Sequence, residues 1–283
     1  MVDCHIHMVL DGLDWRAAIA RHQPHPDEPA IRRTLAAYQA LGYTDLRDGG
    51  DRWGVGALAS RLAPEYGLRY RTPGFPIYKR GHYGSFIGRS FDSPAQYRAL
   101  LHEAKAQGAH FIKIMISGLI DFSRCGVLTE PPVDPQQIRA MIGEAHEMGF
   151  SVMAHANGDA AVRAALRAGV DSIEHGAYLS DETLSQLAES RAVWVPTLAT
   201  IGDLIGSGRF PDAVLQPLLR GQLAAVRTAA ALGARIACGS DAGAYRVLHG
   251  QGGLDELALL RQALGEDAQR IVREGNQSIR ERF

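Results

Sequence analysis

The sequence alternates between short apolar runs and longer segments of helical character. Apolar runs at 110–116, 150–155, 170–175 and 193–196 are each followed by such a segment. This alternation predicts parallel strands joined by helical crossovers. Eight such units in 283 residues fit a closed (β/α)₈ TIM barrel better than an open α/β sheet, which would want a Gly-x-Gly-x-x-Gly turn after its first strand. We therefore expect one barrel domain that covers residues 1–283.

Composition and charge narrow the class of protein. The chain is 46% hydrophobic and 22% charged, with a formal net charge of −1, so nothing points to nucleic acid or membrane as a partner. It contains three cysteines at no Cys-x-x-Cys spacing, which argues against a disulfide framework and for a reducing, cytoplasmic location. We expect a small-molecule substrate, whose specificity lies in the long loops Pro73–Ser93, Ser117–Val133 and Thr197–Pro211.

The first predicted strand carries two histidines, His5 and His7. Side chains alternate along a strand, so both imidazoles point to the same face and can hold one metal ion. Alone, such a pair is as consistent with simple packing as with metal binding. Metal binding is favoured because a TIM barrel places its active site at the carboxyl ends of its strands, where further candidate ligands occur. The candidates at strand ends are His5, His7, Lys113, His155, His175 and Asp241.

These residue types favour a divalent cation. Imidazole nitrogens and a carboxylate suit zinc or another first-row ion. Lys113 cannot bind a cation as an ammonium group, but addition of CO₂ to its amine would give a carbamate able to bridge two metals. The alternative is an unmodified Lys113 that contacts substrate beside a single metal.

Several motifs in order along the chain resemble the amidohydrolase superfamily of metal-dependent hydrolases. More narrowly, the chain is similar to the branch that contains imidazolonepropionase-like proteins and Xaa-Pro dipeptidases. The motifs are Asp3-Cys4-His5-Ile6-His7, Phe111-Ile112-Lys113-Ile114-Met115, Ala154-His155-Ala156-Asn157-Gly158, Ser172-Ile173-Glu174-His175-Gly176, Val195-Pro196-Thr197-Leu198 and Gly239-Ser240-Asp241-Ala242-Gly243, with Arg80-Gly81-His82 and His249-Gly250 as further matches.

The resemblance implies a binuclear centre with assigned roles. His5, His7 and Asp241 would hold the buried ion, His155 and His175 the outer ion, and carboxylated Lys113 would bridge the two. A hydroxide bound by the metals would attack the scissile carbonyl, with Asp241 as general acid and base. His82 is the expected donor to the developing oxyanion, and Tyr78 and Arg246 are expected substrate contacts.

The resemblance therefore implies hydrolysis of a C–N bond in a dipeptide, an N-acyl amino acid or a cyclic amide. An ester, lactone or phosphoester hydrolase is the first alternative, because the same centre attacks those bonds. A deaminase is disfavoured, since the residues after His175 lack the glutamate proton shuttle that such enzymes use. A non-catalytic metal-binding barrel is the remaining class.

Two departures from the family pattern bear on these expectations. Asn157 stands where many relatives have a second histidine, so substrate contacts there are expected to differ. Relatives also carry a small flanking β-sandwich; we expect either that this protein lacks it or that the chain is a trimmed version. Helix surfaces that the sandwich would cover are then exposed, and a homo-oligomer would bury them.

Overall fold

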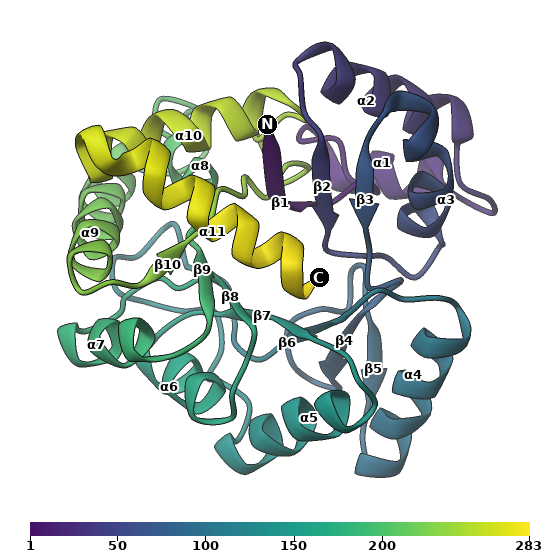
Figure 1. Ribbon diagram of the computed structural model, residues 1–283, viewed down its shortest axis with the longest axis horizontal. Helices are drawn as coiled ribbons and strands as arrows, with labels where there is room; N and C mark the ends of the chain where they lie inside the picture. Colours follow the sequence, from purple (N-terminus) through teal and green to yellow (C-terminus); the bar gives the residue numbers. More distant parts are fainter.

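The computed structural model describes residues 1–283 and shows a ring of helices around parallel strands (Figure 1). The strands are β1 (Val2–Ile6), β2 (Asp45–Asp48), β3 (Arg69–Arg71), β4 (Pro76–Lys79), β5 (Arg89–Phe91), β6 (Ile112–Met115), β7 (Val152–Ala156), β8 (Ser172–His175), β9 (Val193–Val195) and β10 (Arg235–Ile236). Every pair of neighbouring strands runs parallel, as helical crossovers require.

The helices form the outer layer of the molecule. They are α1 (Trp15–Arg21), α2 (Glu28–Ala40), α3 (Val55–Leu62), α4 (Pro94–Ala106), α5 (Pro135–Glu147), α6 (Asp159–Arg167), α7 (Asp181–Glu189), α8 (Ala199–Gly202), α9 (Asp212–Ala231), α10 (Gln251–Leu264) and α11 (Ala268–Arg282), with 3₁₀ turns at Ala63–Tyr66 and Gly265–Asp267. None of these helices has the length and apolar character needed to cross a membrane.

Local sequence explains where the helices begin. Asp134 precedes Pro135 at the start of α5, and its carboxylate accepts hydrogen bonds from the backbone N–H groups of Gln136 and Gln137. Ser93 precedes Pro94 at the start of α4 in the same way. A capping oxygen satisfies donors that have no partner within the helix, and proline at the first position costs no hydrogen bond.

The strands close into a barrel. They form one run in the order β1-β2-β3 and another in the order β10-β9-β8-β7-β6-β4-β5. The two runs meet where the backbone N–H of Cys4 donates to the carbonyl of Cys238 at 2.8 Å and Ile6 bridges Ala242. At the other junction β3 pairs with β2, while β4 pairs with β6, so β3 and β4 occupy one interrupted strand position. This arrangement confirms the predicted (β/α)₈ barrel.

The segment Pro73–Ser93, predicted to be a loop throughout, is partly strand. It contains β4 and β5, which pair with each other and extend the sheet beside β6. The prediction was wrong because the prolines and glycines of this segment, such as Pro73 and Gly74, are strong turn signals. The strand pairing of β4 depends on contacts with β6 that are distant in sequence and overrides the local signal.

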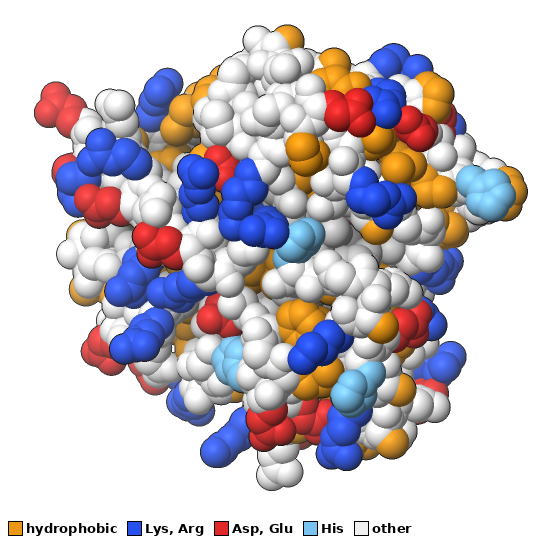
Figure 2. All heavy atoms as spheres, turned by 45° about the vertical axis from the view of Figure 1, so that its right-hand side comes forward, with side chains coloured by type: hydrophobic (Ala, Val, Ile, Leu, Met, Phe, Trp, Pro, Cys, Tyr) orange, Lys and Arg blue, Asp and Glu red, His pale blue; other side chains and the backbone are white.

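Helix α11 covers the amino-terminal end of the barrel and crosses in front of the strands in Figure 1. The ring of Phe283, just after α11, meets Phe111 edge to face at 5.1 Å beneath the barrel interior. The main core lies between strands β4–β10 and the surrounding helices. On the face shown in Figure 2, basic and acidic side chains are interspersed.

Gly275 of α11 marks the closest approach between that helix and the barrel. A Cβ atom at Gly275 would lie 1.9 Å from the carbonyl oxygen of Ile236. Gly275→Ala is therefore expected to lower the free energy of unfolding by about 1–3 kcal/mol through overpacking. Gly221→Ala is the control, since Gly221 is helical, exposed and has no atom in reach, and it should raise stability by about 0.5–1 kcal/mol. Urea unfolding monitored by circular dichroism measures the free energy of unfolding of both variants. Equal changes in the two variants would contradict the packing argument.

Candidate metal centre

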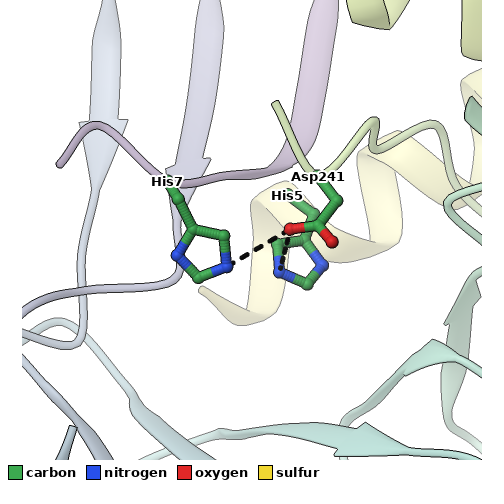
Figure 3. Close-up of side chains that lie close together, drawn as sticks. All are labelled: His5, His7 and Asp241. Carbon is green, nitrogen blue, oxygen red and sulfur yellow. Dashed lines mark ion pairs between the residues drawn. The ribbon is translucent and has the colours of Figure 1, made fainter. Parts of the chain in front are cut away.

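Three side chains from the two ends of the chain meet at the carboxyl end of the barrel (Figure 3). Asp241 Oδ1 lies 3.2 Å from His7 Nε2 and 3.5 Å from His5 Nε2. One ligand atom from each of the three lies within 4.8 Å of the others. Two imidazoles and a carboxylate at this separation form a donor set that fits a first-row divalent cation.

Backbone and side-chain hydrogen bonds hold Asp241 against the first strand. The N–H of Asp241 donates to the carbonyl of His5 at 2.7 Å, and Asp241 adopts a left-handed φ of 62°. The preceding residue is fixed by Asp3, whose two oxygens accept the Ser240 N–H at 2.9 Å and the Ser240 hydroxyl at 2.6 Å. Burial of Asp3 raises its pKa to about 6, against the lowering effect of these hydrogen bonds.

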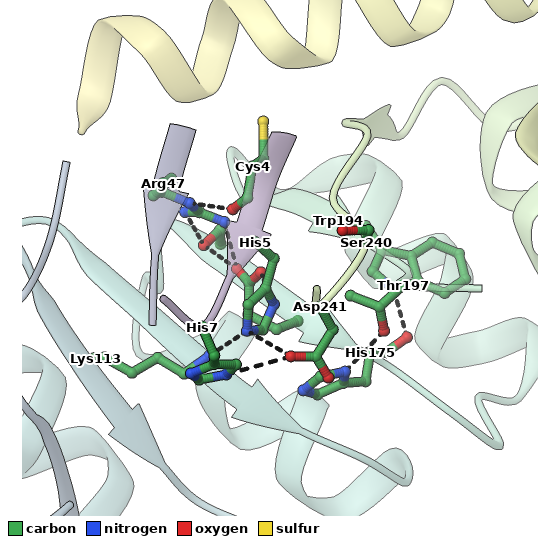
Figure 4. A network of polar contacts seen from close by, with 12 residues as sticks. Cys4, His5, His7, Arg47, Lys113, His175, Trp194, Thr197, Ser240 and Asp241 are labelled. Atoms are coloured by element: carbon green, nitrogen blue, oxygen red, sulfur yellow. Dashed lines mark hydrogen bonds and ion pairs between the residues drawn. The ribbon is translucent and has the colours of Figure 1, made fainter. Parts of the chain in front are cut away.

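Lys113, His155 and His175 lie around this group. Lys113 Nζ in β6 is 3.4 Å from His5 Nε2 (Figure 4), and its side chain is almost fully buried, with no carboxylate within ion-pair distance. The His175 ring lies 5.2 Å from that of His5 and 4.6 Å from that of His155. The structure thus brings all six residues predicted as metal ligands to one end of the barrel; their binding of metal stays a prediction.

The protonation states of these groups suit a cation. Burial lowers the pKa of His155 to about 3 and those of His5 and His175 well below the usual value, which favours the neutral imidazole. Burial by itself opposes ionisation of Asp241, but His5 and the other neighbouring basic groups outweigh it and lower the Asp241 pKa. Burial also lowers the pKa of Lys113 to about 8. Free imidazole lone pairs and an ionised carboxylate are what metal ligation requires.

Residues outside the predicted set orient the histidines. Glu174 Oε2 lies 2.9 Å from His5 Nδ1, while Glu174 Oε1 pairs with Arg47 at 2.8 Å. His175 Nδ1 lies 2.8 Å from the hydroxyl of Thr197, a residue with a left-handed φ of 48°. Sequence reasoning missed these contacts. The available signal was a charged residue, Glu174, inside a predicted buried strand and next to a predicted ligand.

Glycine is required where the His7 ring packs. Gly49 follows β2, and a Cβ atom there would lie 2.2 Å from Cε1 of His7. The backbone at the end of β2 therefore approaches the His7 imidazole as closely as it can. Any side chain at position 49 would displace this ring from Asp241.

The three residues predicted to contact substrate make no hydrogen bond or ring contact with the ligand cluster. Tyr78 lies in β4 and is largely buried against Gly84 and Gly88. His82 is partly exposed in the following loop, and Arg246 is exposed beyond Asp241. None of the three forms a hydrogen bond or ring contact with the ligand cluster, so their roles stay predictions. The neighbour of His82 does make such a contact: the Tyr83 ring lies 4.9 Å from the His155 ring.

Comparison with known proteins decides the family. The model of the amidohydrolase family matches residues 1–273, nearly the whole chain. The chain belongs to the amidohydrolase family.

Three individual relatives of known structure or name share about a quarter or less of their residues with this chain. The chain is 26% identical over 272 residues to ochratoxinase of Aspergillus niger, covering 84% of this chain and 56% of that protein. The structure of a Xaa-Pro dipeptidase with bound methionine superimposes with a TM-score of 0.77 at 21% identity, over 99% of this chain and 75% of that one. A prolidase complexed with N-methylphosphonate-L-proline gives a TM-score of 0.75 at 25% identity, over 99% and 74% of the two chains.

The amidohydrolase match and these superpositions confirm the family resemblance and the barrel predicted from sequence. The chain spans about half the length of the curated relatives it matches, 56% in the case of ochratoxinase.

The contact between Glu174 and His5 gives a test of the centre. Glu174→Gln removes the charge that faces His5 Nδ1, and loss of such an orienting carboxylate typically lowers metal affinity by about 10–100-fold. We expect a decrease of this size in the affinity for Zn²⁺, measured by competition with a chromogenic chelator. Glu182→Gln is the control, because Glu182 is an exposed carboxylate whose partners, Arg163 and Gln186, lie outside the ligand cluster. Unchanged affinity in Glu174→Gln would contradict an orienting role.

Proposed function

We propose that this protein is a metal-dependent hydrolase that cleaves a C–N amide bond in a dipeptide, an N-acyl amino acid or a cyclic amide. The observation that carries the proposal is the convergence of His5, His7 and Asp241, with Lys113 and two further histidines beside them. Family membership supports the reaction class. Relatives named Xaa-Pro dipeptidase and prolidase favour a dipeptide among the candidate substrates.

The contacts among the candidate ligands support the assignment to two ions that the family resemblance implies. His5, His7 and Asp241 would hold one divalent ion, most favourably zinc, and His155 with His175 a second. Bound at this position, the ions would polarise the scissile carbonyl and lower the pKa of a water molecule. Lys113 lies beside His5 as a buried amine with no carboxylate within ion-pair distance. Burial disfavours the ammonium form, and the neutral amine is the form that adds CO₂ to become a carbamate.

Asp241 is suited to proton transfer. Its Oδ1 faces His5 and His7, whereas Oδ2 makes no hydrogen bond or ion pair and the side chain remains about 15% exposed. One oxygen can therefore stay on the ligand side while the other faces the substrate. We assign to Asp241 the removal of a proton from the attacking water and its delivery to the leaving nitrogen, which keeps the departing group neutral.

Asp241→Asn tests this role. Loss of a general acid–base is expected to lower kcat by about 10²–10⁴-fold on Xaa-Pro dipeptides, N-acyl amino acids or cyclic amides. Asp267→Asn is the control, because Asp267 is a surface carboxylate paired with Arg270, outside the predicted loops and ligands. Chelation should abolish turnover and Zn²⁺ should restore it. An undiminished rate in Asp241→Asn would refute its role, while a protein that binds metal yet turns over no carbonyl or phosphoryl substrate would support a non-catalytic barrel.

Lys113→Ala tests the bridge. If a carbamate on Lys113 holds the second ion, metal content should fall from two ions to one per chain, measured by mass spectrometry of metals after dialysis. Lys105→Ala is the control, since Lys105 is an exposed lysine of α4. Equal metal content in Lys113→Ala and the parent protein would instead favour an unmodified lysine beside a single ion.

A further inference from the structure

A row of aromatic rings leads from the molecular surface to the ligand cluster. Trp15 meets Phe86 edge to face at 6.1 Å, Phe86 meets Tyr83 at 5.5 Å, and Tyr83 meets His155 at 4.9 Å. Trp15, at the outer end, is 41% exposed, and Tyr83 and Phe86 are half-buried. We call Trp15, Phe86 and Tyr83 the aromatic row.

The aromatic row differs from the packing pairs of the core. The pairs Phe91–Tyr97 and Phe111–Phe283 are buried on all sides. The row instead joins two separate segments, the start of α1 and the loop after β4. Its outer member Trp15 is exposed, while Phe86 also packs against a hydrophobic core cluster. Arg16 covers Trp15 at 4.4 Å from its ring centroid. Half-exposed aromatic surface that ends at a candidate active site is more typical of ligand binding than of core packing.

Other exposed apolar side chains occur on the same end of the barrel. Leu13 precedes α1, Leu119 lies in the loop after β6, and Leu248 lies in the loop after β10. All three loops follow strands whose carboxyl ends carry predicted ligands. Exposed apolar side chains therefore occur on three loops at this end of the barrel, beside charged ones such as Arg246, while the predicted ligands beneath are polar.

From these observations, and on the basis of the proposed function, we infer the class of substrate. We propose that the scissile amide carries an aromatic or other large apolar group, and that this group lies along the aromatic row while the carbonyl reaches the ligand cluster. Tyr83 stands between the two regions, because its ring contacts His155 and its backbone N–H donates to Glu130 of the neighbouring loop. The row thus sets which side chain is accepted, and the cluster carries out the chemistry.

The kinetic test compares two N-acyl derivatives of one amino acid, an N-acetyl and an N-benzoyl compound. The parent enzyme should prefer the benzoyl compound by about 10²-fold in kcat/KM, since differences of a few apolar carbons discriminate by at least about tenfold. Phe86→Ala should raise KM for the benzoyl compound about tenfold, with little change in kcat, and leave the acetyl compound unaffected. A preference below about threefold, or equal effects of Phe86→Ala on both compounds, would overturn the proposal.

Tyr66→Ala is the matched control. Tyr66 is a half-buried aromatic residue in the 3₁₀ turn before β3; it packs against the same core cluster as Phe86 but makes no ring contact with the aromatic row. Tyr66→Ala should leave the ratio of the two kcat/KM values unchanged. An effect as large as that of Phe86→Ala would mean that loss of core packing, not loss of the row, changes specificity.

A binding measurement separates this proposal from the proposed function. 3-Phenylpropionate, titrated into metal-free protein, should change the fluorescence of Trp15, and Trp15→Phe should abolish the change. Phe86→Ala should weaken this binding about tenfold, while acetate should give no signal. If no amide is hydrolysed but 3-phenylpropionate binds as described, the hydrolase assignment fails and the apolar site stands. If amides are hydrolysed but 3-phenylpropionate does not bind at the row, the inference fails and the hydrolase assignment stands.

Discussion

Closure of the barrel between its first and last strands is the constraint on which the candidate site depends. His5 and His7 belong to the first strand, and Asp241 follows the last one. The hydrogen bonds that join them link backbone atoms more than 230 positions apart, such as Asp241 N–H to the carbonyl of His5. The donor set cannot exist before both ends of the barrel have docked. Asp3 strengthens this junction between the first and last strands, because both of its oxygens accept hydrogen bonds from Ser240, the residue immediately before Asp241.

A buried charge pair beneath the cluster gives the histidines their orientation. Arg47 donates to the carbonyl of Cys4, to the Ser172 hydroxyl and to Glu174, so each nitrogen of its guanidinium has a hydrogen-bond partner. Glu174 then presents its second oxygen to Nδ1 of His5. A proton on that nitrogen leaves the lone pair of Nε2 directed at Asp241 and Lys113. Removal of either charged partner would leave the other buried and uncompensated, which couples stability to the geometry of the site.

The sequence predicted those features of the fold and the site that depend on local periodicity. The alternation of strands and helices predicted the barrel, and histidines at strand ends predicted a set of ligands that the structure brings together. Residues that act through distant contacts escaped detection: nothing local links Asp3 to Ser240 or Arg47 to Glu174. The strands β4 and β5 were missed for the same reason, since proline and glycine dominate their local signal.

The residues that would bind a cation and the residues that would select a substrate lie on different elements of the fold. The candidate ligands lie on or directly after buried strands, whose positions are fixed on both sides by backbone hydrogen bonds. The surrounding loops are joined by side-chain contacts, such as the hydrogen bond from the Tyr83 N–H to Glu130 and the stacking of Arg209 on Tyr245. Substitutions in these loops can therefore reshape the mouth while the ligand geometry persists. That division gives a physical reason why one barrel and one donor set can serve several amide substrates, with the loops deciding among them.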